Sequence, residues 1–337
     1  MKFVPIGKRI ESFKEGIERH FPDGVSPELK RYIAINFVWE KITHGTRFTD
    51  YMQYEYYRYS SHVRREFISE QRRLIIDDVF NTKAGDEIFN EKKLFNEKFA
   101  EFVNRDWLNA ENASYEEFCK FAAEHPVFFG KPVAGSLGRG AGMFDVNNEK
   151  DRNAFFQELK QGKMLLEEVI HQHKELAEFN DTSVNTLRVV TVLRPNGNVA
   201  ILTGDLRLGR KGKTSDNFHN NGIASLFDVE TGVVYTSGID KTNRRYLVHP
   251  DSGKQIIGFH IPVWDKIKDV VVRAAKTVPE VHYVGWDIAI GENEEIYIVE
   301  GNCCADPDVT QMPDGIGKWP LFVPLLEEAR KDYGKNK

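Results

Sequence analysis

The sequence predicts an α+β fold with a mainly helical N-terminal region. Two observations carry this prediction. Up to about residue 110 apolar side chains recur at helical spacing, whereas after Phe118 short apolar runs alternate with glycine-rich turns. After Asn185 the pattern is mostly β, with two hairpins. We therefore expect three units: a helical region over 1–115, a small α+β unit over 116–170 and a larger one over 171–337.

Composition narrows the class of protein. The 337 residues are 41% hydrophobic and 29% charged, with a net charge of −5, which argues against a protein that coats nucleic acid. No apolar run is long enough for a signal peptide or a membrane span. Three cysteines, Cys119, Cys303 and Cys304, fit neither a disulfide framework nor a zinc site, so we expect a cytoplasmic protein with reduced thiols.

The N-terminal region contains a clear helix start. Ser26 is a candidate N-cap, and Pro27 stands at the first helical position. Apolar residues then recur on one helical face, at Leu29, Ile33 and Phe37. A tyrosine-rich stretch over 51–59 is either a stacking surface for a base or sugar, or a helix-packing surface, and we favour packing. A charged, helix-like segment follows over 63–80.

The middle of the chain predicts strand, loop, strand, helix and strand, over 127–133, 135–142, 143–146, 151–160 and 164–170. Lys131 ends the first strand, and the loop after it holds four glycines. Glycine lets backbone N–H groups approach a phosphate, and a nearby lysine adds charge. The loop is neither a Walker A sequence nor a Rossmann fingerprint, so a flexible hairpin loop is an equal alternative.

The strand that ends at residue 170 carries two adjacent acids, Glu167 and Glu168. Backbone groups at such a strand end would suit an adenine edge, and a glutamate would suit a ribose hydroxyl. The alternative is a pair of exposed acids at a sheet edge. Farther on, strands over 186–193 and 199–208 flank the turn Pro195-Asn-Gly-Asn, and an amphipathic helix is expected over 262–278.

The most informative segment is the last hairpin, over 283–301, with a polar turn at Asn293-Glu294. Symmetric folding at that turn places Asp287 opposite Glu300, and Asn302 lies on the same face. Two opposed carboxylates repel unless a cation lies between them. Two carboxylates and an amide oxygen suit Mg²⁺, with positions left for water and phosphate. The alternative is two solvated acids on an exposed face, and we favour the metal.

These motifs, in this order, resemble the ATP-grasp superfamily over roughly residues 90–310. Within it, Ser183-Val-Asn-Thr-Leu-Arg-Val-Val-Thr and Asp216-Asn-Phe-His-Asn-Asn-Gly-Ile look like the sugar-transfer-associated ATP-grasp family, as does Lys93-Leu-Phe-Asn-Glu-Lys-Phe. The resemblance implies two α+β subdomains that grip ATP, with Mg²⁺ as cofactor. It also implies a pathway that makes a cell-surface polysaccharide or a natural product. The helical N-terminal region departs from the α/β domain of many such enzymes, so acceptor binding is not carried over.

The resemblance implies a role for each matching residue. Lys93 resembles the first nucleotide lysine, although the adjacent Lys92 makes the alignment ambiguous, and Lys131 resembles the second, on the phosphates. The other nucleotide positions are the loop Ser136, Leu137, Gly138, Arg139 and Gly140, the adenine segment Glu167, Glu168 and Val169, and the ribose candidate Glu175. Arg188 and Arg207 resemble the basic residues that face the γ-phosphate and the acyl phosphate. Asp287, Glu300 and Asn302 resemble the magnesium ligands.

The chemistry that the resemblance implies is carboxylate activation. ATP converts a carboxylate to an acyl phosphate, and an amine displaces the phosphate, with catalysis by Lys131, Arg188 and Arg207. The substrates would be a small-molecule carboxylate and an amine, such as an amino acid or amino sugar. Candidate acceptor residues are Arg210, Asn217, His219 and Asn221. A kinase that stops at phosphoryl transfer and a non-catalytic nucleotide-binding scaffold remain alternatives, and the sequence does not fix the oligomeric state.

Overall fold

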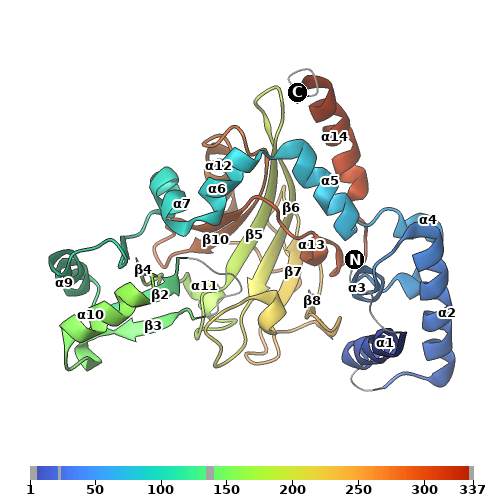
Figure 1. Cartoon of the computed structure of the whole chain (residues 1–337), viewed down its shortest axis with the longest axis horizontal. Coiled ribbons are helices and arrows are strands. Elements are labelled where there is room, and N and C mark those ends of the chain that lie inside the picture. Colours follow the sequence, from blue (N-terminus) through green and yellow to red (C-terminus); the bar gives the residue numbers. More distant parts are fainter. Residues whose placement is uncertain (1–5, 22–23, 134–139, 334–337) are drawn as a thin grey trace.

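The computed structural model describes residues 6–21, 24–133 and 140–333. Three parts lie side by side: a small sheet with two helices, a large central sheet, and a group of N-terminal helices (Figure 1). Within these ranges the sheets have four and seven strands, and every strand pair is antiparallel. None of the helices in the described ranges combines the length and apolar character that crossing a membrane requires.

The N-terminal helices are α1 (Ile6–His20), α2 (Pro27–His44), α3 (Phe48–Gln53), η1 (Tyr56–Arg58), α4 (Ser61–Arg64) and α5 (Glu70–Phe80). They contribute to two hydrophobic clusters, both of which also include residues of the central sheet. Ser26 caps α2 as predicted, because its hydroxyl accepts from the Leu29 amide at 3.2 Å. Tyr51 and Tyr57 are buried, which confirms packing as the role of the tyrosine-rich stretch. The single helix expected over 63–80 is wrong, since a break separates α4 from α5.

The four-stranded sheet runs in the order β1-β4-β2-β3. Its strands are β1 (Trp107–Asn109), β2 (Val127–Pro132), β3 (Gly142–Asp145) and β4 (Met164–Glu168), with η2 (Val146–Asn148) after β3. Helices α9 (Tyr115–Glu124) and α10 (Arg152–Gln161) pack on one face through Phe118, Phe128 and Phe156. We call this unit the lid. It includes β1, so the boundary predicted at residue 115 falls inside it.

The seven-stranded sheet runs in the order β11-β10-β5-β6-β7-β8-β9. Its strands are β5 (Thr186–Leu193), β6 (Val199–Leu208), β7 (Ile223–Phe227), β8 (Gly238–Ile239), β9 (Arg245–Tyr246), β10 (Tyr283–Ile290) and β11 (Ile296–Asn302). Its helices are α6 (Lys83–Asn90), α7 (Lys92–Lys98), α8 (Ala100–Val103), α11 (Lys174–Ala177), η3 (Phe218–Asn220), α12 (Trp264–Ala274), α13 (Asp308–Gln311) and α14 (Trp319–Tyr333). Both predicted hairpins are therefore confirmed.

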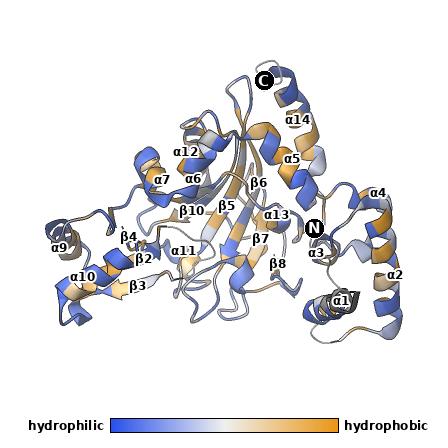
Figure 2. Ribbon diagram, viewed as in Figure 1, coloured by the Kyte–Doolittle hydropathy of each residue, from blue (hydrophilic) through white to orange (hydrophobic). Residues whose placement is uncertain are grey.

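The two faces of the central sheet are covered differently, because successive side chains on a strand point to opposite faces. One face packs through Trp286 against α6, α7, α8 and α12. On the opposite face, α5 and α14 pack over Val190 and Tyr283. The N-terminal helices pack over Ala224 and Ile239 on that same face. Helices α2, α5 and α14 accordingly carry both hydrophobic and hydrophilic stripes (Figure 2).

Candidate functional site

A row of four charged side chains crosses the central sheet. Glu300 on β11 lies opposite Asp287 on β10, Asp287 lies opposite Arg188 on β5, and Arg188 lies opposite Asp205 on β6. Directly opposed residues share a face, so all four project from the same side of the sheet. We call this set the charged row. It lies on the face that α5, α14 and the N-terminal helices flank.

The predicted pairing of Asp287 with Glu300 is confirmed, but it arises in a different way. Near the turn Ile290 lies opposite Ile296, and continuing that register would place Val299 opposite Asp287. A β-bulge between these two stretches adds one residue to β11 and brings Glu300 into place. The pairing of Asp287 with Glu300 thus depends on a bulge that the predicted symmetric hairpin did not include.

Two arginines neutralise the buried carboxylates of the row. Arg188 donates from Nε to Oδ1 of Asp287 and from Nη2 to Oδ2 at 2.8 Å. Arg207 donates from Nε to Oδ1 of Asp205 at 3.0 Å, and its Nη1 lies 3.5 Å from Asp287. Burial opposes the ionisation of Asp287, but the two guanidinium groups outweigh it and lower its pKa. These contacts hold Asp287 as a carboxylate with a fixed orientation.

The charged row also carries negative charge that Arg188 and Arg207 together leave uncompensated. Burial raises the pKa of Asp205, and its Oδ2 has no hydrogen-bond partner within the part of the chain that is described. The surrounding protein reduces the solvation of Glu300, and the Asp287 charge adds to this, so the pKa of Glu300 is also raised. Asn302 donates to Oε1 of Glu300 at 3.2 Å. Such an oxygen-rich set fits a hard divalent cation such as Mg²⁺.

Across from the row, the lid contributes a buried ion-pair network centred on Glu167. Lys131 on β2 lies 2.9 Å from Oε2 of Glu167, and Arg105 lies 2.8 Å from Oε1. Arg105 also donates to the carbonyl of Ile298 on β11 at 3.0 Å. Burial alone would raise the pKa of Glu167, but the two cations lower it to about 2. The carboxylate predicted to line adenine therefore ties the lid to the central sheet and positions Lys131.

The two adjacent lysines at the predicted nucleotide position, Lys92 and Lys93, have different surroundings. Lys93 lies 3.7 Å from Glu97, one helical turn along α7. Lys92 instead donates to the carbonyl of Pro132 at 2.7 Å, at the end of β2. Burial and the charge of Lys131 lower the pKa of Lys92. Lys92, rather than Lys93, lies with Lys131 beside the charged row, because the charge of Glu300 reaches both lysines.

The remaining nucleotide candidates are spread over the lid and its connection to the central sheet. Ser136, Leu137, Gly138 and Arg139 lie outside the described residues. Gly140 has φ +78°, a left-handed conformation that favours glycine. Glu168 accepts from the Asp106 amide at 3.1 Å, and Val169 is half-buried just after β4. Glu175 is exposed on the short helix α11.

The four acceptor candidates do not form one group. Arg210 is held by both carboxylate oxygens of Asp251, at 2.8 and 3.1 Å. Asn217 accepts from the amide of His219 at 2.8 Å and so caps η3. Asn221 has φ +69° and ends the same turn. The His219 ring lies 3.5 Å from the buried carboxylate of Asp308.

Sequence reasoning missed four polar residues that organise this region. They are the buried Arg105, Asp205 and Asp308 and the half-buried Asp216. Asp216 accepts from the backbone and hydroxyl of Thr186 at 2.8 and 2.6 Å, and burial raises its pKa to about 6. The alternation of Asp205 and Arg207 on β6 was a usable signal, because residues two apart share a strand face. No local sequence pattern indicated a role for Arg105, because its partners Glu167 and Ile298 lie far along the chain.

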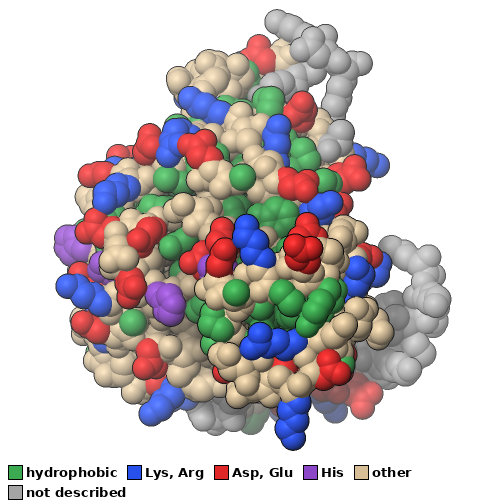
Figure 3. Space-filling view, turned by 90° about the vertical axis from the view of Figure 1, so that its left-hand side faces the viewer, with side chains coloured by type: hydrophobic (Ala, Val, Ile, Leu, Met, Phe, Trp, Pro, Cys, Tyr) green, Lys and Arg blue, Asp and Glu red, His purple; other side chains and the backbone are tan. Residues whose placement is uncertain are grey.

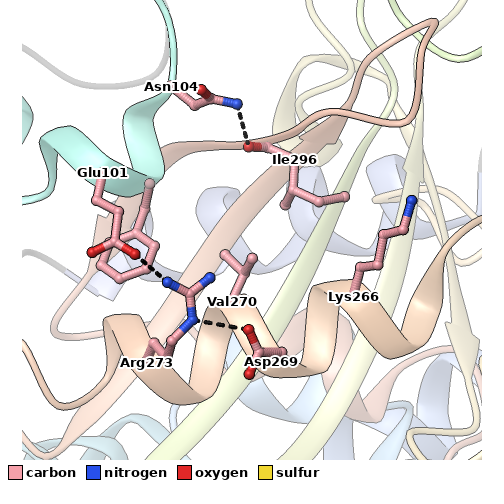
Figure 4. Close-up of a pocket in the computed structure, with 8 residues that line it drawn as sticks. Glu101, Asn104, Lys266, Asp269, Val270, Arg273 and Ile296 are labelled. Atoms are coloured by element: carbon pink, nitrogen blue, oxygen red, sulfur yellow. Dashed lines mark hydrogen bonds and ion pairs between the residues drawn. The ribbon is translucent and has the colours of Figure 1, made fainter.

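One cavity among the described residues lies away from the charged row. It has a volume of about 430 Å³ and lies between α8, α12 and β11, on the helix-covered face (Figure 4). Arg273 pairs there with Asp269 and Glu101, and Asn104 donates to the carbonyl of Ile296 at 3.5 Å. Because Arg273 already pairs with two carboxylates, this cavity is poorly suited to bind a phosphate group. The lid end of the molecule likewise mixes cationic and anionic side chains (Figure 3).

The chain resembles solved structures of ATP-grasp proteins at low sequence identity. The chain is similar to the structure of the ATP-grasp ligase PsnB complexed with a minimal precursor, with 16% sequence identity and a TM-score of 0.47. The match covers 74% of this chain and 64% of that one. Its similarity to biotin carboxylase from Campylobacter jejuni is 14% identity with a TM-score of 0.49, covering 74% and 48%. The chain thus spans less than two thirds of either protein, and likenesses this distant carry no argument about activity.

No curated protein matches the chain. The profile of the sugar-transfer associated ATP-grasp family matches residues 87–322, which include the lid, the central sheet and the whole charged row. The N-terminal helices α1 to α5 precede the matched segment. The chain belongs to the sugar-transfer associated ATP-grasp family.

Proposed function

We propose that this protein is an ATP- and Mg²⁺-dependent ligase that activates a carboxylate as an acyl phosphate and joins it to an amine. The observation that carries the proposal is the charged row with Lys92 and Lys131 beside it. Oxygen ligands for a cation and fixed cations for phosphate oxygens meet between two sheets, as phosphoryl transfer requires. Family membership supports the same reading.

Each group has a defined part in this proposal. Lys92, Lys131 and the glycine-rich loop bind the ATP phosphates, and Asp287, Glu300 and Asn302 hold Mg²⁺. Bound Mg²⁺ supplies charge neutralisation on the transferred phosphoryl group. Arg188 and Arg207 stabilise the negative oxygens of the acyl phosphate. We keep polysaccharide or natural-product biosynthesis as the proposed pathway and the cytoplasm as the proposed location. Three free cysteines are consistent with that location.

An isotope experiment separates a ligase from a kinase. The protein is incubated with ATP, Mg²⁺, ¹⁸O-labelled carboxylates and a panel of amino acids and amino sugars. Attack on an acyl phosphate transfers one carboxylate oxygen to the released phosphate, so we expect ¹⁸O in inorganic phosphate only when an amine is present. Mass spectrometry of the phosphate measures this. A stable phosphorylated product from one acceptor, with no labelled phosphate, would establish a kinase instead.

The adjacent lysines provide a matched pair of variants. We expect Lys92→Met to weaken binding of a non-hydrolysable ATP analogue with Mg²⁺ by about tenfold or more, because a charge-assisted contact to phosphate is lost. Lys93→Met should change that affinity by about twofold at most, since Lys93 pairs with Glu97 on the surface of α7. Isothermal titration calorimetry measures both. The reverse order would return the nucleotide role to Lys93.

A further inference from the structure

A second cavity lies between the N-terminal helices and the central sheet. Its volume is about 280 Å³, which suits a small molecule. Helices α1 and α3 contribute Arg19, Phe48 and Met52, and the central part contributes a mixed charged and apolar wall. That wall is built from Phe218, His219, Lys241, Asp308 and Met312. Neither the helical region nor the family-matched segment forms this cavity alone.

The sheet register places this cavity next to the charged row. Arg207 lies opposite Ala224 on β7, and Ala224 lies opposite Ile239 on β8. Ala224 and Ile239 belong to the hydrophobic cluster that also contains Met52. The cavity wall is therefore continuous with the sheet face that carries Arg207. Burial raises the pKa of Asp308, and the Arg207 charge acts against this rise, which is in keeping with that continuity.

The cavity wall carries charged and polar side chains of both signs. Asp308 is 3% exposed, and its Oδ2 lies 3.5 Å from Nε2 of His219. Burial and the Asp306 charge raise the pKa of Asp308 to about 6. Lys241 donates to the carbonyl of His219 at 2.9 Å. Arg19 is exposed on α1 and forms no ion pair within the described ranges.

We propose that this cavity binds the amine substrate, and that this substrate is an α-amino acid with an apolar side chain. Its ammonium group would meet Asp308 and His219, its carboxylate would meet Arg19 and Lys241, and its side chain would lie on Phe48, Met52, Phe218 and Met312. The proposal rests on the ligase function proposed above. It gives the N-terminal helices a role, since they supply Arg19 and part of the apolar wall.

The arrangement also completes the chemistry. A protonated amine has no lone pair, so a proton must leave before it attacks the acyl phosphate. Asp308 receives that proton, because burial favours the neutral form of its carboxyl group. The new N–C bond then forms as the acyl C–O bond to phosphate breaks. Phosphate leaves toward Arg207, and the second amine proton passes to solvent.

Calorimetric titration of the full chain with amino acids tests the site without any turnover. The probes are L-leucine, L-methionine and L-phenylalanine, each without ATP, with 4-methylpentanoate as the analogue of leucine that lacks the amine. We expect at least one amino acid to bind and 4-methylpentanoate to bind at least about tenfold more weakly. Arg19→Gln and Asp308→Asn should each weaken the amino acid by about tenfold or more. Lys14→Gln, an exposed position on the same helix, should leave the affinity within about twofold.

Two further variants keep the result decisive. His219 is half-exposed, so His219→Ala replaces Asp308→Asn if the latter fails to fold. Glu300→Ala should still bind the amino acid although it removes a metal ligand. Absence of binding by all three amino acids, or binding that survives both Arg19→Gln and His219→Ala, overturns the proposal. If amino-acid binding behaves as expected while the ¹⁸O experiment fails, the ligase function falls and the binding site stands.

Discussion

Glu300→Ala should abolish ATP turnover while the protein stays folded. Asp287 cannot hold Mg²⁺ alone, because Arg188 already engages both of its oxygens. Loss of metal-based charge neutralisation is worth several kcal/mol, or on the order of 1,000-fold in rate. ADP release measured in the presence of acceptor checks this. Glu292→Ala is the matched control, because Glu292 is an exposed acid at the turn of the same hairpin.

The stability of the Glu300→Ala variant tests separately whether Glu300 is a structural residue. Glu300 faces the Asp287 carboxylate across the strand pair, and like charges directly opposed destabilise a sheet. In the absence of metal, the free energy of unfolding of Glu300→Ala should therefore exceed that of the natural protein by about 0.2–1 kcal/mol. Urea unfolding measures this difference. Lower stability would show that Glu300 is a structural residue. Retained turnover would refute the metal assignment.

Glu167→Ala should cause the largest loss of stability of the variants considered. It leaves Arg105 and Lys131 without their carboxylate, and the Arg105 side chain is only 1% exposed. Removing one partner of a buried ion pair typically costs about 3–5 kcal/mol. Urea unfolding at pH 7 measures the loss, and hydrogen exchange in β2 and β4 should locate it in the lid. The neighbouring Glu168→Ala should cost less than about 1 kcal/mol, because Glu168 is half-buried at the strand end.

The pH dependence of this ion pair has a defined sign. The pKa of Glu167 is about 2 in the folded chain and about 4.3 in an unfolded one. A carboxylate with a depressed folded pKa stabilises the protein above its unfolded pKa and loses that effect as the pH falls toward the folded value. The difference between the natural protein and Glu167→Gln should therefore shrink between about pH 4 and pH 2. A difference that stays constant over that range would contradict an ionised Glu167.

Local patterns predicted much of the fold. Residue alternation and the turn sequences gave both hairpins of the central sheet, and Ser26 with Pro27 marked the start of α2 correctly. These signals succeed because strand faces, turns and helix caps are decided by residues close together in the chain. The pairing of Asp287 with Glu300 also followed from the sequence, although a bulge rather than a symmetric turn produces it.

The ion-pair partners of the charged side chains could not be predicted from local patterns, because they lie far apart in the sequence. Glu167 suggested an adenine contact but pairs with Arg105, 62 residues away, and Asp287 pairs with Arg188 across 99 residues. Lys92 and Lys93 are equivalent in the sequence, and only the packing of α7 against the lid separates them.

By itself, then, the sequence determined the two hairpins, the pairing of two acids on the last hairpin and the family likeness, because each depends on residues close together in the chain. The tertiary structure alone decided which of the two adjacent lysines contacts the lid, which carboxylates are neutralised and where a cavity opens between the N-terminal helices and the central sheet. Burial and Coulomb interactions set those outcomes, and both depend on segments that meet only when the chain folds.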